Sequence, residues 1–191
     1  MSLDIPYCIF KILIAINFYS LIFHVIIFVK KRMAVAYLLL GSNIGESKEH
    51  LQNAKNFIQD CIGEIEVQSS IYTTAAWGNK DQADFLNQVI IINTTLSPFD
   101  TLEKILNIEQ KMGRIRTEKN AARIIDIDIL FFSNEIINTD NLIVPHPHIQ
   151  VRKFVLVPLN EIAPTFIHPI LDKTIHQLLL QCEDNLTVNK I

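Results

Sequence analysis

Two aspartates in an apolar segment are the residues of this chain best suited to chemistry. Residues 123–132 read RIIDIDILFF, so Asp126 and Asp128 stand two positions apart among β-branched and aromatic residues, which favour a strand. Because side chains alternate across a strand, we expect both carboxylates to leave by one face. Two anions side by side on a half-buried strand repel each other and lose solvation, so they need a cation. Ligation by oxygen alone favours Mg²⁺.

Basic side chains are concentrated on both sides of this pair in the sequence. Those before it are Arg114, Arg116, Lys119 and Arg123, and those after it are His146, His148, Arg152 and Lys153. Mg²⁺ bridges carboxylate and phosphate oxygens, and guanidinium groups bind the oxygens that remain, so the combination favours a site for metal-bound polyphosphate. Either signal alone is typical of an exposed strand or a solvated loop.

A glycine-rich phosphate loop is absent from the sequence. No Gly-x-x-x-x-Gly-Lys-Ser/Thr and no Gly-x-Gly-x-x-Gly occurs, which excludes a P-loop, a kinase glycine loop and a dinucleotide fold. Gly41-Ser42-Asn43 by itself predicts only a tight turn. Residues 77–87, WGNKDQADFLN, bring aromatics, an amide and small residues into a long loop. This composition suits a flat heteroaromatic ligand, although burial of Trp77 and Phe85 in the core is an equal alternative.

The elements that must position these residues mix strands and helices without a strict βαβ rhythm. Apolar runs and alternation predict strands at residues 34–40, 64–72, 85–96 and around the aspartates, and a hairpin from 136–138 and 142–144. Helical spacing predicts helices at 47–63, 97–113, 154–162 and 174–182, the second with Ser97 as its cap and Pro98 at its first position. Two successive strands without a helix between them favour an α+β fold, a mainly antiparallel sheet with helices packed on it.

Composition fits one globular domain. The chain has 191 residues, of which 49% are hydrophobic and 19% charged, enough for a sizeable core. A net charge of -3 means that the chain has no overall positive field, which proteins that bind nucleic acid through its phosphates usually have. Cys8, Cys61 and Cys182 are odd in number and far apart, which excludes a zinc motif or a disulfide framework. We expect reduced, buried thiols in a cytoplasmic protein.

The first 32 residues differ from the rest. Residues 9–29 are almost wholly apolar and precede Lys30-Lys31-Arg32, and about 20 such residues can span a membrane. However, Met33 begins the first predicted strand at once, and residues 1–32 contain no Gly. We expect residues 1–32 to be a hydrophobic extension that results from a misassigned start, and residues 33–191 to form the domain. A membrane anchor is the alternative.

In their order and spacing, the motifs after Met33 resemble those of one family, the 6-hydroxymethyl-7,8-dihydropterin pyrophosphokinases of folate biosynthesis. The motifs are Gly-Ser-Asn at 41–43, Asp-Gln at 81–82 with Asp-Phe-Leu-Asn at 84–87, Glu109 with Gly-Arg-x-Arg at 113–116, residues 123–130, and Val-Pro-His-Pro-His at 144–148 followed by Arg152 and Phe154. The resemblance implies a ferredoxin-like αβα sandwich with helices on both faces of the sheet. It also implies transfer of pyrophosphate from ATP to the pterin hydroxymethyl group, with release of AMP.

The resemblance further implies roles for individual residues. Asp126 and Asp128 would ligate two Mg²⁺ ions, and Arg114 and Arg123 would bind the phosphates and stabilise transition-state charge. The positions that match those around ATP, the co-substrate, are Glu109, Arg116, Ile129, His146 and Arg152. The positions that match those around the pterin are Thr74, Ala76, Trp77, Phe85, Asn87 and Phe154, with the two phenylalanines stacked on the ring. We expect these two small molecules as partners, no nucleic acid, a monomer, and membrane contact only if residues 1–32 are made.

The chain departs from the family pattern at three places. Asn120-Ala121-Ala122 stand where the family often has an aromatic followed by Gly-Pro, Ala75-Ala76 replace Pro-Pro, and Leu106 replaces a frequent Gln. The first departure concerns the cover over the nucleotide rather than the reaction.

Two other classes of function are compatible with part of the sequence. Antiparallel sheets with aromatics and basic loops can bind RNA, but Asp126 and Asp128 would repel phosphates without a metal, and no stacking motif of that class occurs. A membrane-tethered adaptor with an inactive core would use residues 1–32, and Mg²⁺-dependent ATP binding separates it from the enzyme.

Overall fold

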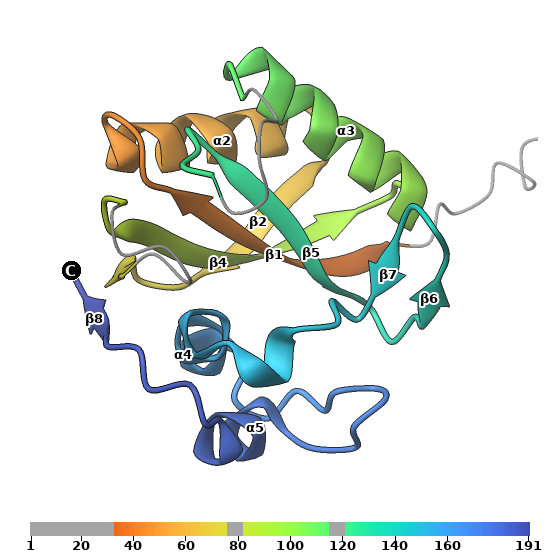
Figure 1. Ribbon diagram of the computed structural model, residues 1–191. Helices are drawn as coiled ribbons and strands as arrows, with labels where there is room; N and C mark the ends of the chain where they lie inside the picture. The colour runs from red at the N-terminus through yellow and green to blue at the C-terminus, as the bar shows by residue number, and fades with distance from the viewer. Residues whose placement is uncertain (1–32, 76–81, 115–120) are drawn as a thin grey trace, which may run out of the picture. The chain divides into compact units, whose positions relative to one another are not determined.

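An antiparallel sheet carries most of the predicted site residues (Figure 1). The computed structural model describes residues 33–75, 82–114 and 121–191, and residues 33–191 form one unit. The strand order is β5-β1-β4-β3-β8, and β2 pairs with β4 on the same side as β3. The strands are β1 (Ala34–Ser42), β2 (Gly63–Gln68), β3 (Tyr72–Thr74), β4 (Phe85–Thr94), β5 (Asp126–Phe132) and β8 (Val188–Lys190).

The register of the central strands places the end of β1 beside the beginnings of β4 and β5. On β1, Gly41 pairs with Asn87 of β4 on one side and with Asp126 of β5 on the other. Leu39, two residues earlier, pairs with Asp128. Because paired residues and residues two apart share a face of the sheet, this register places the aspartates of β5 and the Asn87 side chain of β4 on one face, on the two strands that flank β1.

Helices cover both faces of the sheet (Figure 1). On one face, α2 (Ser47–Cys61) and α3 (Pro98–Lys111) enclose a core with the even-numbered leucines of β1, while α4 (Lys153–Ile162) and α5 (Ile175–Gln181) enclose a second core with Leu39 on the other. The predicted α+β sandwich with helices on both faces is confirmed. The Ser97 cap is also confirmed, because its hydroxyl accepts from the Asp100 nitrogen at 3.1 Å and α3 begins at Pro98.

The predicted hairpin is present as β6 (Ile137–Asn138) and β7 (Ile143–Val144), followed by the short 3-10 helix η1 (Ile149–Val151). The single strand predicted at 64–72 is wrong, because β2 ends at Gln68 and β3 begins at Tyr72. Between them the Ser69 hydroxyl, buried against β4, accepts from the Val89 nitrogen at 3.0 Å and so replaces a ladder bond. Strand β8 was not predicted, and it extends the sheet beside β3.

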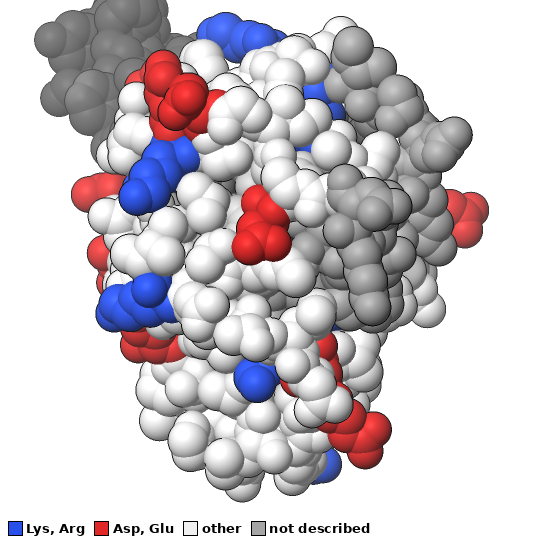
Figure 2. Space-filling model, turned by 60° about the vertical axis from the view of Figure 1, so that its left-hand side comes forward, with Lys and Arg blue, Asp and Glu red and all other residues white. Residues whose placement is uncertain are grey.

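One prediction is wrong, and several others concern residues outside those that the structure describes. Cys61 is exposed at the end of α2 and Cys182 is partly buried, so the prediction of buried thiols is wrong for Cys61. The predictions for residues 1–32, Ala76, Trp77 and Arg116 lie outside the described residues. Within residues 33–75, 82–114 and 121–191, no helix has both the length and the apolar character needed to cross a membrane. On the face shown in Figure 2, the described lysines and arginines lie singly among acidic and uncharged residues, without a continuous basic patch.

Candidate active site

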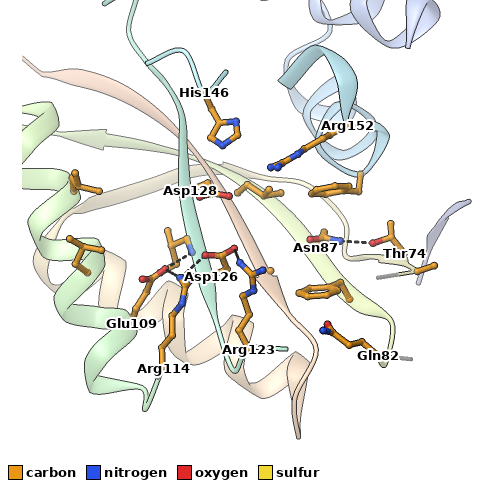
Figure 3. Close-up of a pocket in the computed structure, with 18 residues that line it drawn as sticks. Thr74, Gln82, Asn87, Glu109, Arg114, Arg123, Asp126, Asp128, His146 and Arg152 are labelled. Atoms are coloured by element: carbon orange, nitrogen blue, oxygen red, sulfur yellow. Dashed lines mark hydrogen bonds and ion pairs between the residues drawn. The ribbon is translucent and has the colours of Figure 1, made fainter. Parts of the chain in front are cut away.

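A cavity of about 380 Å³ opens where the ends of β1, β4 and β5 meet (Figure 3). Its walls also include residues of α3 and of the segment that leads into α4. Eleven of the predicted site residues line it: Thr74, Phe85, Asn87, Glu109, Arg114, Arg123, Asp126, Asp128, His146, Arg152 and Phe154. They come from positions 74 to 154 of the chain, so the fold brings together residues that are far apart in sequence.

Asp126 and Asp128 both face this cavity, as the alternation along β5 predicts. Burial raises the pKa of Asp128 to about 7, and the negative charge of Asp126 adds to the effect. No described residue forms a hydrogen bond or an ion pair with the Asp128 side chain, although the positive charges of Arg152 and Arg123 act on it through space. Its surroundings therefore favour the neutral form of Asp128 unless a cation lies beside it.

Two arginines, in contrast, contact Asp126. Arg114 forms ion pairs with Glu109 and Asp126, and Arg123 forms one with the other oxygen of Asp126. Glu109 is 3% exposed, and its Oε1 also accepts a hydrogen bond from the Ile127 nitrogen at 2.8 Å. Burial lowers the pKa of Arg114, but the carboxylates of Asp126 and Glu109 outweigh this and raise it. Both guanidinium groups thus lie against the carboxylate of Asp126.

His146 lies above Asp128 on the opposite side from these arginines (Figure 3). Its backbone nitrogen donates to the Leu130 carbonyl at 2.9 Å, which fixes the segment to β5. Burial, helped by the positive charge of Arg152, lowers the pKa of the ring to about 4, so the ring is neutral at pH 7. Since Nδ1 accepts from the His148 nitrogen at 3.2 Å, the ring proton is on Nε2.

The other half of the cavity is apolar with one buried amide. Asn87, 3% exposed, donates from Nδ2 to the Thr74 hydroxyl at 2.8 Å, which fixes the orientation of its amide. The guanidinium carbon of Arg123 lies 5.7 Å from the centre of the Phe85 ring, and that of Arg152 lies 5.7 Å from the centre of the Phe154 ring. Both distances allow cation–π attraction, so each aromatic ring adjoins the charged half of the cavity.

The sequence model of one family, described as 7,8-dihydro-6-hydroxymethylpterin-pyrophosphokinase (HPPK), matches residues 37–164. The chain belongs to this family. Members of the HPPK family are ATP-dependent diphosphotransferases of folate synthesis. The matched range contains every residue that we found to line the cavity.

Individual relatives agree with the family match. The chain is 41% identical to the 2-amino-4-hydroxy-6-hydroxymethyldihydropteridine pyrophosphokinase of Aquifex aeolicus, over 76% of this chain and 90% of that protein. It is 45% identical to the protein of the same name from Bacillus subtilis, over 68% of this chain and 78% of that protein. Similarity to the folic acid synthesis protein FOL1 of Dictyostelium discoideum, 37% identical, covers 82% of this chain but only 24% of that longer protein.

Among solved structures, HPPK-DHPS of Plasmodium falciparum resembles this chain in fold. In one crystal structure, that of a triple mutant with STZ-DHP, the TM-score is 0.66 at 20% identity, over 78% of this chain and 43% of that chain. This likeness agrees with the αβα architecture of residues 33–191.

One described residue of the predicted site, Ile129, does not line the cavity, and several residues that do line it were not predicted. The Ile129 side chain is buried in the core on the α3 face and does not line the cavity, so its predicted place beside ATP stays a prediction. Ala75 also lines the cavity, within the predicted pterin-lining segment that begins at Thr74. The lining residues for which no role was predicted are Leu39, Gly41, Gln82, Leu102, Leu106 and Ile127. Gly41 and Gln82 belong to family motifs, and Leu106 stands where the family often has Gln, so the signal was present for these three. Among the described residues, no group of three or more His, Cys, Asp or Glu side chains could hold a metal ion.

Proposed function

We propose that this chain transfers the terminal pyrophosphoryl group of ATP to the hydroxymethyl oxygen of 6-hydroxymethyl-7,8-dihydropterin. In this reaction the bond between the β-phosphorus and the oxygen that bridges it to the α-phosphorus breaks, and a bond from the hydroxymethyl oxygen to the β-phosphorus forms. AMP leaves with the bridging oxygen. The observation that carries the proposal is one cavity, in a chain of the HPPK family, that joins a carboxylate pair and arginines to an aromatic slot with a buried amide.

Asp126 and Asp128 fit a site for two Mg²⁺ ions. The Asp128 carboxylate is partly buried with a raised pKa, and two carboxylates on one face supply oxygen ligands but leave most coordination positions to phosphate oxygens and water. When bound, Mg²⁺ would neutralise phosphate charge and make the attacking hydroxyl more acidic. A pair of carboxylates suffices for this, because Mg²⁺ bound with nucleotides takes one or two carboxylates plus phosphates.

The side chains around the aspartates would bind and orient the phosphates. Arg114 and Arg123 are charged, and each can exchange a carboxylate oxygen of Asp126 for a phosphate oxygen. Neutral His146, with its proton on Nε2, can donate to an oxygen of the leaving AMP or of the transferred group. Glu109, which lines the cavity beside the proposed ATP site, would also position Arg114, since its carboxylate is buried and bonded to the Ile127 nitrogen.

The aromatic half would bind the pterin. Phe85 and Phe154 supply ring faces for a flat heterocycle, and the Asn87 amide, fixed by Thr74, offers hydrogen bonds to its polar edge. A buried amide penalises a ring that leaves it unpaired, which gives specificity. The proposed contacts also include Ala76 and Trp77 with the pterin and Arg116 with ATP, as the family resemblance implies.

We further propose that residues 33–191 contain the whole catalytic domain, that it acts as a monomer, and that it works in the cytoplasm. The family membership favours the enzyme over an RNA-binding module or a membrane-tethered adaptor. The net charge of -3 agrees, because nucleic acid is bound through extended basic surfaces.

The test uses the purified full-length chain with Mg²⁺, hydroxymethyl-dihydropterin and ATP that is labelled on its γ-phosphate. We expect the label in the pterin product and AMP in equal amount. Formation of ADP would contradict pyrophosphoryl transfer. The same assay on residues 33–191 tests the domain boundary, since retained activity would show that the first 32 residues are not required.

A further inference from the structure

Asn43 connects two segments that both border the cavity, one with Gln82 and one with Arg123. Its Nδ2 donates to the Ala83 carbonyl at 3.2 Å and to Gln82 Oε1 at 3.4 Å. Its Oδ1 accepts from the Arg123 nitrogen at 2.8 Å, and its own backbone nitrogen donates to the Arg123 carbonyl at 3.1 Å. One side chain at the end of β1 thus holds partners 39 to 80 positions away in the chain.

The Asn43 amide can hold both segments only in one orientation. Nδ2 is the donor and Oδ1 the acceptor, so a flipped amide would place oxygen against the Ala83 carbonyl and nitrogen against the Arg123 nitrogen. The residue is 7% exposed, and a buried amide that loses its partners pays the desolvation cost of each group. The two segments are therefore fixed in position relative to each other.

The segments held by Asn43 lead to the two halves of the cavity. Arg123 forms the ion pair with Asp126, and its guanidinium carbon lies 5.7 Å from the centre of the Phe85 ring. Phe85 follows Ala83 by two residues and begins β4. Asn43 itself does not line the cavity, so it acts on any ligand through Arg123 and Phe85.

From this geometry we propose that Asn43 is a positioning residue that couples the two substrates. An anion bound by Arg123 and a ring stacked on Phe85 each fix one of the segments that Asn43 joins, so binding of either substrate orders the segment used by the other. Each substrate therefore tightens the binding of its partner. The inference rests on the proposed function, because it takes ATP and the pterin as the two ligands.

Calorimetric titrations of the full-length chain test this coupling. The probes are hydroxymethyl-dihydropterin and Mg²⁺ with an ATP analogue that carries a methylene bridge between its α- and β-phosphates and cannot transfer. The ratio of pterin Kd without and with the analogue is the coupling factor. We expect about fivefold or more for the unmodified chain and less than about twofold for Asn43→Ala, with each single-ligand Kd little changed.

Asn93→Ala is the matched control. Asn93 lies on β4 and donates to Glu66 Oε2 at 3.0 Å on the exposed surface, so its variant also loses an asparagine hydrogen bond but should keep the full coupling factor. A wild-type coupling factor in Asn43→Ala, or no coupling in the unmodified chain, would overturn the inference. If the unmodified chain bound neither probe, the proposed function itself would fail, which is a different result.

Asn43→Asp keeps the proposal testable if Asn43→Ala does not fold. The carboxylate has the same shape and still accepts from the Arg123 nitrogen, but it turns an oxygen toward the Ala83 carbonyl in place of the donor. We expect its coupling factor to fall as in Asn43→Ala. Coupling equal to that of the unmodified chain would show that the contact with the 82–83 segment has no such role.

Discussion

Glu109 accepts a hydrogen bond from the backbone nitrogen of Ile127, the residue between the two aspartates, at 2.8 Å. The bond joins α3 to β5 at the wall of the cavity, and the same carboxylate oxygen contacts Arg114. One buried group therefore determines both where β5 lies and where the arginine points.

Replacement of Glu109 by Ala should lower both stability and turnover. The Ile127 N–H would be left buried without its acceptor, which costs about 1–3 kcal/mol, and Arg114 would lose one of its two anchors. Urea unfolding and AMP release measure the two effects. Glu103→Ala, on the exposed side of the same helix, is the control, and equal stability of the two variants would refute the role of Glu109.

Replacement of Asn87 by Ala should weaken pterin binding without affecting nucleotide binding. The amide is the buried polar group of the aromatic half, so its loss should raise the pterin Kd by about 10- to 100-fold, corresponding to roughly 1–3 kcal/mol. Calorimetry with the pterin and the non-transferring ATP analogue gives both affinities. Thr74→Val, which removes the hydroxyl that orients Asn87, should show the same pattern to a lesser degree. Equal losses for both ligands would instead indicate general damage to the cavity.

Replacement of Gly41 by Ala should also act on the pterin side. A Cβ at this position would lie 3.2 Å from Asn87 Oδ1, which is tighter than an ordinary contact, and 3.9 Å from a ring carbon of Phe85. We expect the amide to shift and pterin affinity to fall by roughly tenfold, about 1.4 kcal/mol, while the chain still folds. A pterin Kd equal to that of the unmodified chain would show that the amide has room to adjust.

Acid should destabilise the fold through Glu161. Burial alone would raise its pKa, but hydrogen bonds from Lys190, Ser70 and Tyr72 lower the pKa to about 2, against 4.5 for a free glutamate. Because the folded-state pKa is the lower one, this stabilisation is complete above pH 4.5 and is lost as the pH falls from 4.5 toward 2. In urea unfolding over this range, the unmodified chain should have a higher free energy of unfolding than Glu161→Gln at pH 4.5, and this difference should shrink as the pH falls. A difference that stays constant across the range would contradict this account.

Local patterns predicted the parts of the structure that depend on neighbours in sequence. Alternation along β5 is enough to place Asp126 and Asp128 on one face, and Ser97 with Pro98 is enough to start α3. The resemblance to the family added Thr74 and Phe154, for which the local pattern had no signal, and gave Phe85 a specific role that its loop composition only suggested.

Interactions across long stretches of chain could not be predicted in this way. Strand β8 has three residues, and it joins β3 where Glu161 accepts from Lys190, Ser70 and Tyr72. Gly41-Ser42-Asn43 predicted a turn, but the role of Asn43 depends on partners near positions 83 and 123 that only the fold brings close. Tertiary contacts also determine that the strand predicted at residues 64–72 is interrupted at Ser69.

The most direct test of the central claim is AMP release by Asp128→Asn as a function of Mg²⁺ concentration. The amide keeps the shape of the side chain but removes the charge that would bind the metal, so we expect turnover to fall at least about a hundredfold at every Mg²⁺ concentration. Asp140→Asn, at an exposed position outside the cavity, should keep the rate and Mg²⁺ dependence of the unmodified chain. Turnover by Asp128→Asn close to that of the unmodified chain would contradict the assignment of the aspartate pair as the metal site.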